Sequence, residues 1–364
     1  MSEAKPKILV TGAAGYLASW IVEKLLREGH VVHGTVRQLN DKSKIQHLLD
    51  LARQHPDRLR LFEADLIKGG SFDAAMAGCS VVIHAASPYF LDKPKDPDQQ
   101  LIKPALDGTL NVLASVDRCE TVKRVVVTSS VVTMYNDACD VSSTSQNMVQ
   151  ENDVNPNRQI RHNPYACSKT IAEQAAWEAS TRQKRWDLVT IHPGAIFGPS
   201  LSKRLDATSV NMMIQFLNGS FRSGVPRLWL GLVDVRDVAS AHVKAAILPQ
   251  AHGRYIVVAD SLSLLEIASL MRVDEFGIKD KLPKGEVPKA FMWVIGPLTG
   301  MQRRYISRNV GYPVRFNNTR SQTELGLQYR PPQETLNGHI RQLVADKLVA
   351  ARSILSKTTW SSQT

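Results

Sequence analysis

Residues 7–20 read KILVTGAAGYLASW, and this stretch decides the fold. The run KILVT is short, apolar and rich in β-branched residues, which is typical of a buried strand. Gly12 and Gly15 follow it, and Ala18 stands where the Gly-x-Gly-x-x-Gly/Ala fingerprint has its third small residue. Apolar residues then recur at helical spacing over residues 16–29, which end in a glycine suited to a helix stop. The stretch therefore predicts a strand, a glycine turn and a helix.

The same alternation continues along the chain. Strands that alternate with helices indicate crossover connections, and hence a doubly wound parallel α/β sheet of the Rossmann type. The predicted strands lie within residues 7–12, 31–36, 58–66, 80–87, 124–132, 187–194 and 253–260, with helices that include residues 71–78 and 105–120.

The regular pattern weakens after about Pro199. A Ser-capped helix is predicted from Ser261. The polar segment 136–163 is predicted to be a long loop, a kind of segment that often carries function. We predict an NADP-binding domain over residues 1–198 with a return segment at about 230–260, and a smaller, mostly helical substrate-binding lobe over residues 199–229 and 261–350.

The composition excludes some classes of protein. The 364 residues carry a net charge of +11, and 43% are hydrophobic, which suits a globular protein with a large core. The basic residues are dispersed, and their densest stretch, residues 301–320, is broken by Gly and Pro, so we expect no nucleic-acid partner. The longest apolar run, residues 290–301, is too short to span a bilayer, so we expect no membrane partner.

The four cysteines predict no metal site. Cys79, Cys119, Cys139 and Cys167 form no Cys-x-x-Cys motif and have no histidine at metal-ligand spacing. Scattered reduced thiols fit a reducing compartment, and the first residues contain no apolar signal core. We therefore expect a cytoplasmic protein, with monomer and homodimer both left open.

The glycine turn and the second strand together predict the cofactor. Glycine lets backbone approach a pyrophosphate, and free N–H groups at the following helix N-terminus hold the anion. A plain turn is the alternative, although the strand before and the helix after favour dinucleotide binding. Where an NAD site has an acid at the end of the second strand, this chain has Arg37, with Lys44 nearby. Cations there favour the 2′-phosphate of NADP, the alternative being that both are simply exposed.

The run NPYACSKT from Asn163 places Tyr165 and Lys169 on one face of a predicted helix. They are either a pair at the edge of the core or a pair that moves a proton. A free phenol has a pKa of about 10, and an adjacent ammonium stabilises its anion. Ser129 and Ser130 end a predicted strand, where a hydroxyl could hold a substrate carbonyl.

This ordered set of motifs resembles a known family. The sequence is similar to the extended short-chain dehydrogenase/reductases, most closely to their dihydroflavonol-reductase-like branch with its bacterial and fungal aldehyde and ketone reductases. The similarity runs through almost the whole chain. The matching stretches are VTGAAGYLASW (10–20), GTVR (34–37), VIHAASP (82–88), VTSSVV (127–132), YACSKTIAEQAAWE (165–178), IHPGAIFGP (191–199), DVRDVASAHVKA (234–245) and NTRSQTELGLQYRP (318–331).

The resemblance implies a role for each matching residue. Tyr165 would be the general acid of carbonyl reduction, Lys169 would bind the nicotinamide ribose and lower the pKa of Tyr165, and Ser130 would bond the substrate oxygen. The implied cofactor is NADP(H). Its other contacts would be Gly12, Ala14, Gly15, Tyr16 and Leu17 at the pyrophosphate, Arg37 and Lys44 at the 2′-phosphate, Asp65 and Leu66 at the adenine, Ala85, Ala86 and Ser87 at the nicotinamide ribose, Pro193 and Ile196 at the nicotinamide, and also Thr128.

The substrate is expected to be a hydrophobic aldehyde or ketone. Tyr135 stands where the plant flavonoid reductases carry an Asn that reads substrate hydroxyls, so a flavonoid is not expected. Ser87, Tyr89 and Phe90 lie beside the expected crevice and complete the candidate substrate contacts. The alternative is that these aromatic residues only pack the smaller lobe. Asn111 matches the proton-relay Asn of short-chain enzymes poorly, and capping or packing is its alternative.

Other functions on the same fold remain open. A nucleotide-sugar epimerase retains NAD and favours an acid at the second strand, so Arg37 disfavours it, and a hydroxysteroid-type dehydrogenase is a further enzyme alternative. A catalytically silent NADP-binding regulatory protein belongs to a different class. Such a protein has no need of Ser130, Tyr165 and Lys169 together.

Overall fold

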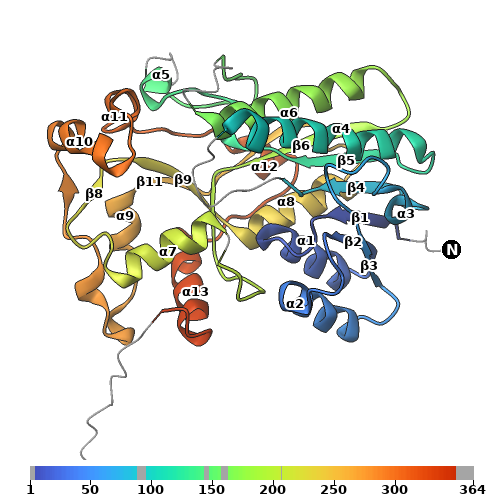
Figure 1. Ribbon diagram of the computed structural model, residues 1–364, viewed down its shortest axis with the longest axis horizontal. Coiled ribbons are helices and arrows are strands. Elements are labelled where there is room, and N and C mark those ends of the chain that lie inside the picture. The colour runs from blue at the N-terminus through green and yellow to red at the C-terminus, as the bar shows by residue number, and fades with distance from the viewer. Residues whose placement is uncertain (1–4, 88–95, 143–146, 157–162, 206, 350–364) are drawn as a thin grey trace, which may run out of the picture.

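Seven parallel strands form the central sheet of the protein, in the order β10-β6-β5-β4-β1-β2-β3 (Figure 1). The computed structural model describes residues 5–87, 96–142, 147–156, 163–205 and 207–349. The strand order reverses between β1 and β4, the kind of place at which doubly wound sheets bind ligands. The strands are β1 (Lys7–Thr11), β2 (Val31–Val36), β3 (Leu59–Glu63), β4 (Val81–His84), β5 (Arg124–Thr128), β6 (Asp187–Pro193) and β10 (Gly253–Val257). The predicted fold class is confirmed.

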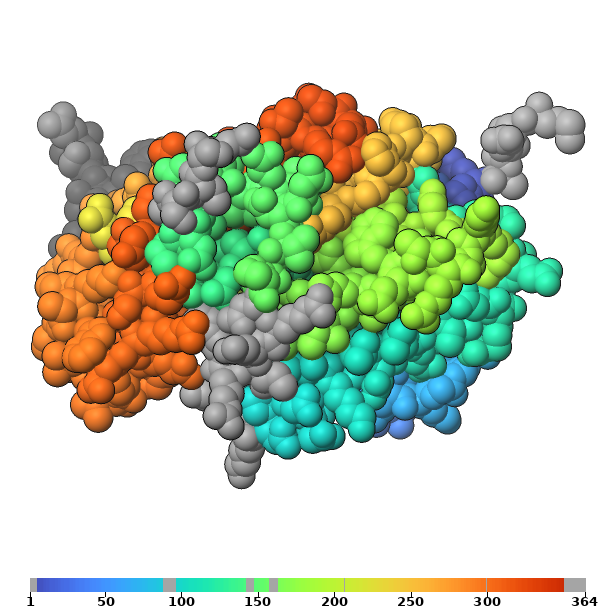
Figure 2. Space-filling view, turned by 90° about the horizontal axis from the view of Figure 1, so that it is seen from above, coloured from blue at the N-terminus to red at the C-terminus, as the bar shows by residue number. Residues whose placement is uncertain are grey.

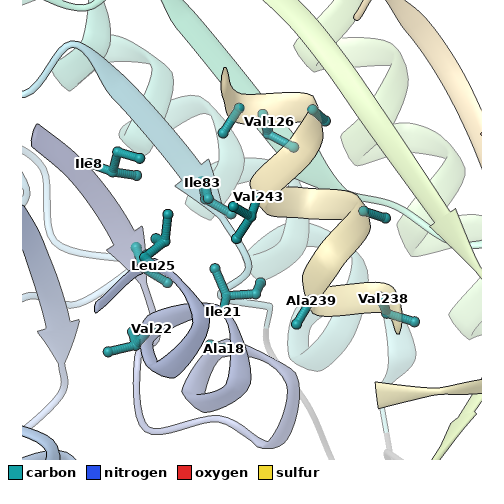
Figure 3. Close-up of a cluster of buried hydrophobic side chains, with 14 of the residues drawn as sticks. Ile8, Ala18, Ile21, Val22, Leu25, Ile83, Val126, Val238, Ala239 and Val243 are labelled. Carbon is teal, nitrogen blue, oxygen red and sulfur yellow. The ribbon is translucent and has the colours of Figure 1, made fainter. Parts of the chain in front are cut away.

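Helices cover both faces of this sheet. Successive side chains of a strand point to opposite faces, so Ile8 packs into one core and Leu9 into the other. Figure 3 shows Ile21 and Leu25 of α1 meeting Val243 of α8 over the first face. That face carries α1 (Tyr16–Arg27), α2 (Lys42–Gln54) and α8 (Val235–Ile247), whereas α3 (Asp73–Met76), α4 (Lys103–Arg118) and α6 (Pro164–Thr181) cover the other.

The C-terminal half builds a second, smaller core. Phe197, Met213, Phe216 and Ile340 are buried there. Three strands, β7 (Ala195–Phe197), β9 (Trp229–Asp234) and β11 (Asp260–Ser263), and the pair β8 (Val225–Pro226) and β12 (Glu286–Val287) accompany the helices. The main helices are α7 (Thr208–Asn218), α9 (Leu264–Ser269), α10 (Lys289–Ile295), α11 (Arg303–Asn309) and α13 (Pro332–Ala345). Figure 2 shows the segment of α10 and α11 in orange on one side of the molecule, with α4 and α6 in teal and green on the other.

The Ser-capped helix begins later than the sequence predicts. Residues Ser261 to Ser263 belong to β11, and the cap is Ser263. Its hydroxyl accepts a bond from the Glu266 N–H at 3.2 Å, and the Glu266 carboxylate accepts one from the Ser263 N–H at 2.7 Å. This reciprocal capping box fixes the helix start two residues beyond the first serine.

The chain passes between the two cores more than once. The indole of Trp20 donates to the carbonyl of Pro199 at 2.8 Å, which ties α1 to the start of the second lobe. After α11 the chain returns through α12 (Thr319–Thr323), and Leu325 and Leu327 pack into the sheet core beside α8. The exact division into domains stays a prediction.

One glycine fixes the junction that follows β6. A Cβ at Gly194 would lie 2.2 Å from the carbonyl oxygen of Gly231 in β9. We expect Gly194→Ala to lower the free energy of unfolding by about 2 kcal/mol, because backbone must move to admit the methyl group. Gly69→Ala is the matched control, since nothing lies within 4 Å of the Cβ it would add. Denaturant titration measures both, and equal midpoints for the two variants would contradict this account.

Candidate active site

The predicted site residues meet at one edge of the central sheet. The strands are parallel, so their carboxyl ends share an edge. The glycine turn follows β1, Arg37 follows β2, residues 85–87 follow β4, residues 128–130 end β5 and Pro193 ends β6. Segments that are far apart in sequence are thereby brought together.

The glycine turn has the backbone that an anion site requires. Gly12 has a φ of +64°, and a Cβ there would lie 3.0 Å from the Cβ of Ala86. The Gly15 N–H donates to the Gly12 carbonyl at 2.8 Å, and α1 then begins at Tyr16 with no side-chain cap and no acid in its first turn. The first amides of a twelve-residue helix are thus available to an anion.

Three side chains predicted to line the pyrophosphate are engaged in contacts with the rest of the protein. Ala14 is buried, and Leu17 packs against the core beneath the sheet. The Tyr16 hydroxyl donates to the carbonyl of Gly198 at 2.6 Å, and burial raises the pKa of this phenol. These residues could contact a pyrophosphate only through their backbone.

The two predicted phosphate-binding cations differ in their surroundings. Arg37 is exposed, and among the described residues its guanidinium makes no hydrogen bond or ion pair. Lys44 pairs with Asp41 at 2.7 Å, and this contact lowers the pKa of the Asp41 carboxyl. The pair is exposed, so it holds Lys44 weakly. Arg37 is the better placed of the two to meet an incoming anion.

Asn111 holds the loop that carries Asp65 and Leu66. Its amide donates to the carbonyls of Leu66 at 3.1 Å and Lys68 at 2.8 Å, and its oxygen accepts from the Gly70 N–H at 3.2 Å. In the structure the side chain of Asn111 thus has a structural role, because it holds this loop. Asp65 is exposed and Leu66 is half-buried at the end of β3.

Tyr165 and Lys169 lie in the first two turns of α6. The helix is capped by Asn163, whose side chain accepts from the Ala166 N–H at 3.1 Å. Tyr165 is 43% exposed, whereas Lys169 reaches inward and donates to the Thr128 carbonyl at 3.4 Å. Burial lowers the pKa of Lys169 to about 8, against the opposing effect of the Glu173 charge.

The two serines at the end of β5 have different partners. The Ser129 hydroxyl is buried and donates to Glu173 at 2.6 Å. The Ser130 oxygen accepts a long bond of 3.4 Å from the Val132 N–H, and its hydroxyl donates to no acceptor among the described residues. Of the two, Ser130 has the hydroxyl that could bond a ligand.

A small pocket adjoins these residues. It extends from Leu66 to the sheet edge and is bordered by His84, Ala86, Ser87, Thr128, Ser129, Lys169 and Glu173. His84 is a packed core residue: its Nδ1 bonds the Thr11 hydroxyl at 2.9 Å, and burial lowers its pKa to about 3. A neutral imidazole is thus part of the pocket wall.

The candidate substrate residues are only partly described. Tyr89 and Phe90 lie outside the described residues. Tyr135 is half-buried, and its ring packs edge-on against Phe316, with 5.9 Å between the ring centroids. Ile196 is half-buried in β7, just beyond Pro193. Tyr135 and Ile196 are thus both partly accessible.

The sequence interpretation missed a buried polar cluster behind the catalytic candidates. It consists of Glu173 on α6, His192 on β6 and Arg254 on β10. The signal for Glu173 was present, because it follows Lys169 by four residues, as Lys169 follows Tyr165. No local pattern identified the other two, because they lie on strands distant in sequence.

Two kinds of feature are absent from the described residues. No group of three or more His, Cys, Asp or Glu in the described ranges could hold a metal ion. No helix within those ranges is long and apolar enough to cross a membrane.

A parallel sheet with a glycine turn at its reversal point defines a Rossmann-type dinucleotide-binding protein. The chain belongs to the NAD dependent epimerase/dehydratase family, whose model matches residues 8–259. The resemblance to extended short-chain dehydrogenase/reductases and to their dihydroflavonol-reductase-like branch is thereby confirmed.

The relatives and solved structures that resemble this chain include several reductases. Cinnamoyl-CoA reductase CAD2 of Medicago truncatula is 40% identical over 268 residues, which cover 73% of this chain and 79% of the relative. Dihydroflavonol 4-reductase of Gerbera hybrida is 32% identical over 80% of this chain and 77% of the relative. The structure of yeast methylglyoxal/isovaleraldehyde reductase Gre2 complexed with NADPH has a TM-score of 0.77 and 26% identity, and covers 94% of this chain and 99% of that one.

Proposed function

We propose that this protein reduces a hydrophobic aldehyde or ketone with NADPH, and that Tyr165 supplies the proton. At the coarser level the chain is an NAD(P)-dependent oxidoreductase that acts on carbonyl or hydroxyl groups. The observation that carries the finer proposal is the edge of the sheet itself. There Tyr165 and Lys169 share one face of α6, and Lys169 donates to the carbonyl of Thr128, two residues before Ser130. The Ser130 hydroxyl donates to no acceptor among the described residues.

The donor set fits a phosphorylated dinucleotide. The uncapped start of α1 offers amides to a pyrophosphate, and Gly12 lets that backbone pass close to Ala86. Arg37 would meet the 2′-phosphate through a guanidinium fork, with Lys44 as a second cation. Asp65 and Leu66 would border the adenine, and residues 85–87 the nicotinamide ribose. The NADPH complex of Gre2 supports this choice of cofactor.

The residues of the site divide the chemistry among themselves. When bound, the reduced cofactor supplies the hydride. Ser130 would hold the carbonyl oxygen by a hydrogen bond, and Tyr165 would donate its phenolic proton to that oxygen as negative charge develops. Lys169 as an ammonium would bind the ribose hydroxyls and stabilise the phenolate that Tyr165 leaves behind. Pro193 and Ile196 would support the nicotinamide face.

The proposal of a hydrophobic substrate rests on the apolar side chains that follow Ser130. Tyr135 and Phe316 present aromatic surface next to the segment that follows Ser130. A polar reader of substrate hydroxyls is missing at position 135, and apolar pockets discriminate weakly, by about 1–3 kcal/mol per methylene. Broad selectivity is therefore expected.

A substrate panel tests this proposal. We expect kcat/KM for benzaldehyde-like and phenyl-ketone substrates to exceed that for small polar aldehydes by at least about tenfold. The measurement follows NADPH absorbance at saturating cofactor for the carbonyl substrates. Sugar nucleotides are tested beside them with NAD by product analysis, because an epimerase returns its hydride and leaves no net change in absorbance. A preference for sugar nucleotides would instead support the epimerase alternative, and no turnover of any carbonyl would support the silent regulatory protein.

A further inference from the structure

Glu173 lies one helical turn beyond Lys169, on the face of α6 that also carries Tyr165. Residues spaced by four share one face of a helix. The side chain of Glu173 is only 6% exposed, and a buried carboxylate is stable only with close partners. Its partners come from three strands of the sheet.

The partners of Glu173 hold both carboxylate oxygens. Oε2 accepts from the Ser129 hydroxyl at 2.6 Å, and Oε1 accepts from Nε of Arg254 at 2.8 Å. Nε2 of His192 lies 3.4 Å from Oε1. Burial alone would raise the pKa of Glu173, but His192, Arg254 and the Ser129 hydroxyl outweigh it and hold the pKa below its ordinary value. Glu173 is therefore ionised at neutral pH.

Two histidines near Lys169 carry no charge at neutral pH. His84 on β4 borders the same pocket as Lys169, and His192 on β6 lies 3.4 Å from Glu173. Burial lowers the pKa of His84 to about 3 and that of His192 to about 4, so both imidazoles are neutral. Glu173 thus supplies the negative charge that favours the ammonium form of Lys169.

We propose that Glu173 is a positioning residue for carbonyl reduction, acting through Lys169 and Ser129. Its charge keeps Lys169 an ammonium, and its bond to the Ser129 hydroxyl leaves Ser130 as the serine that faces the substrate. Arg254 anchors the carboxylate: its other nitrogens donate to the Glu151 carbonyl at 2.8 Å and the Thr133 hydroxyl at 3.1 Å. This inference rests on the proposed function, because it assigns Lys169 to the nicotinamide ribose.

A purely structural role for Glu173 makes a different prediction. The Glu173–Arg254 pair also ties α6 to β10, and Glu173→Gln leaves a half-buried guanidinium without its counter-charge. The double variant Glu173→Gln, Arg254→Met removes both charges. It therefore leaves no uncompensated charge at this place that could prevent folding. If the pair only holds the fold together, NADPH binding by this double variant has the same pH midpoint, assigned to Lys169, as binding by the wild type.

The test follows NADPH binding without turnover. The dissociation constant is measured by cofactor fluorescence between pH 6 and 10 for the wild type, both Glu173 variants and Lys169→Met. In the wild type we expect weaker binding as Lys169 loses its proton around its pKa of about 8. In Glu173→Gln this midpoint should fall by about one pH unit or more, the shift that loss of a nearby opposite charge produces. In the double variant it should fall by less, because the like charge of Arg254 is lost as well. Lys169→Met should lack the transition.

The outcomes separate this inference from the proposed function. An unchanged midpoint in both Glu173 variants overturns the role of Glu173, as does a double variant that returns to the wild-type midpoint. A wild type without any transition assigned to Lys169 overturns it too. Turnover retained by Tyr165→Phe counts against the proposed function alone, and a lowered midpoint in the Glu173 variants would still support the link to Lys169.

Discussion

Tyr165→Phe is expected to lower kcat by about 10²–10⁴-fold, the usual contribution of a positioned general acid. The change removes one hydroxyl and leaves the ring, so the half-exposed start of α6 keeps its packing. NADPH affinity should stay at the wild-type value, because Lys169 still reaches toward the end of β5. Steady-state kinetics with a phenyl ketone and fluorescence titration of NADPH measure the two quantities.

Tyr329→Phe is the matched control for this experiment. It removes a phenol that bonds the Ser321 hydroxyl at 2.8 Å and the backbone of Val258, neither of which is a predicted site residue, and kcat should not change. A folded Tyr165→Phe variant with the kcat of this control would refute Tyr165 as the proton donor.

Arg37→Asp is expected to raise the KM for NADPH by at least about 10²-fold while the KM for NADH hardly changes. Hydrogen bonds to charged groups contribute about 1.5–3 kcal/mol each, and the new carboxylate would also repel the 2′-phosphate. Arg37 makes no ion pair among the described residues, so the substitution leaves no partner unpaired there. Kinetics with both cofactors at a fixed carbonyl concentration give the comparison.

The control for Arg37→Asp is Arg53→Asp, the same change of charge at the far end of α2. Arg53 is 72% exposed, and within the part of the chain that the structure describes it pairs only with the neighbouring Asp50. Its replacement should leave the preference between the cofactors intact. If the wild-type protein used NADH and NADPH equally well, the prediction would lose its basis.

Local patterns in the sequence were sufficient to predict the sheet and its glycine turn. Gly12 and Gly15 follow an apolar run and precede a helical one, so strand, turn and helix are all visible within residues 7–20. The positions of Tyr165 and Lys169 on α6 could be predicted in the same way, from helical spacing alone.

The interactions around these residues could not be predicted, because they join distant segments. Arg254 meets Glu173 across 81 residues of sequence, and Asn111 holds a loop more than forty residues earlier in the chain. The start of α9 was predicted too early because Ser261 and Ser263 are both possible caps, and pairing of β11 with β9 decides between them. Such choices depend on the tertiary neighbours of a segment.

The repeated passage of the chain between its two cores limits how this enzyme can be recombined with its relatives. A chimera that exchanges the smaller lobe at one junction would have to rebuild the contact in which the Trp20 indole donates to the Pro199 carbonyl. It would also replace Leu325 and Leu327, which fill the sheet core beside α8. Under the proposed function, new specificity is therefore better sought by substitutions around Tyr135 and Phe316 than by transplanting a module, because no single cut in the chain separates the two cores.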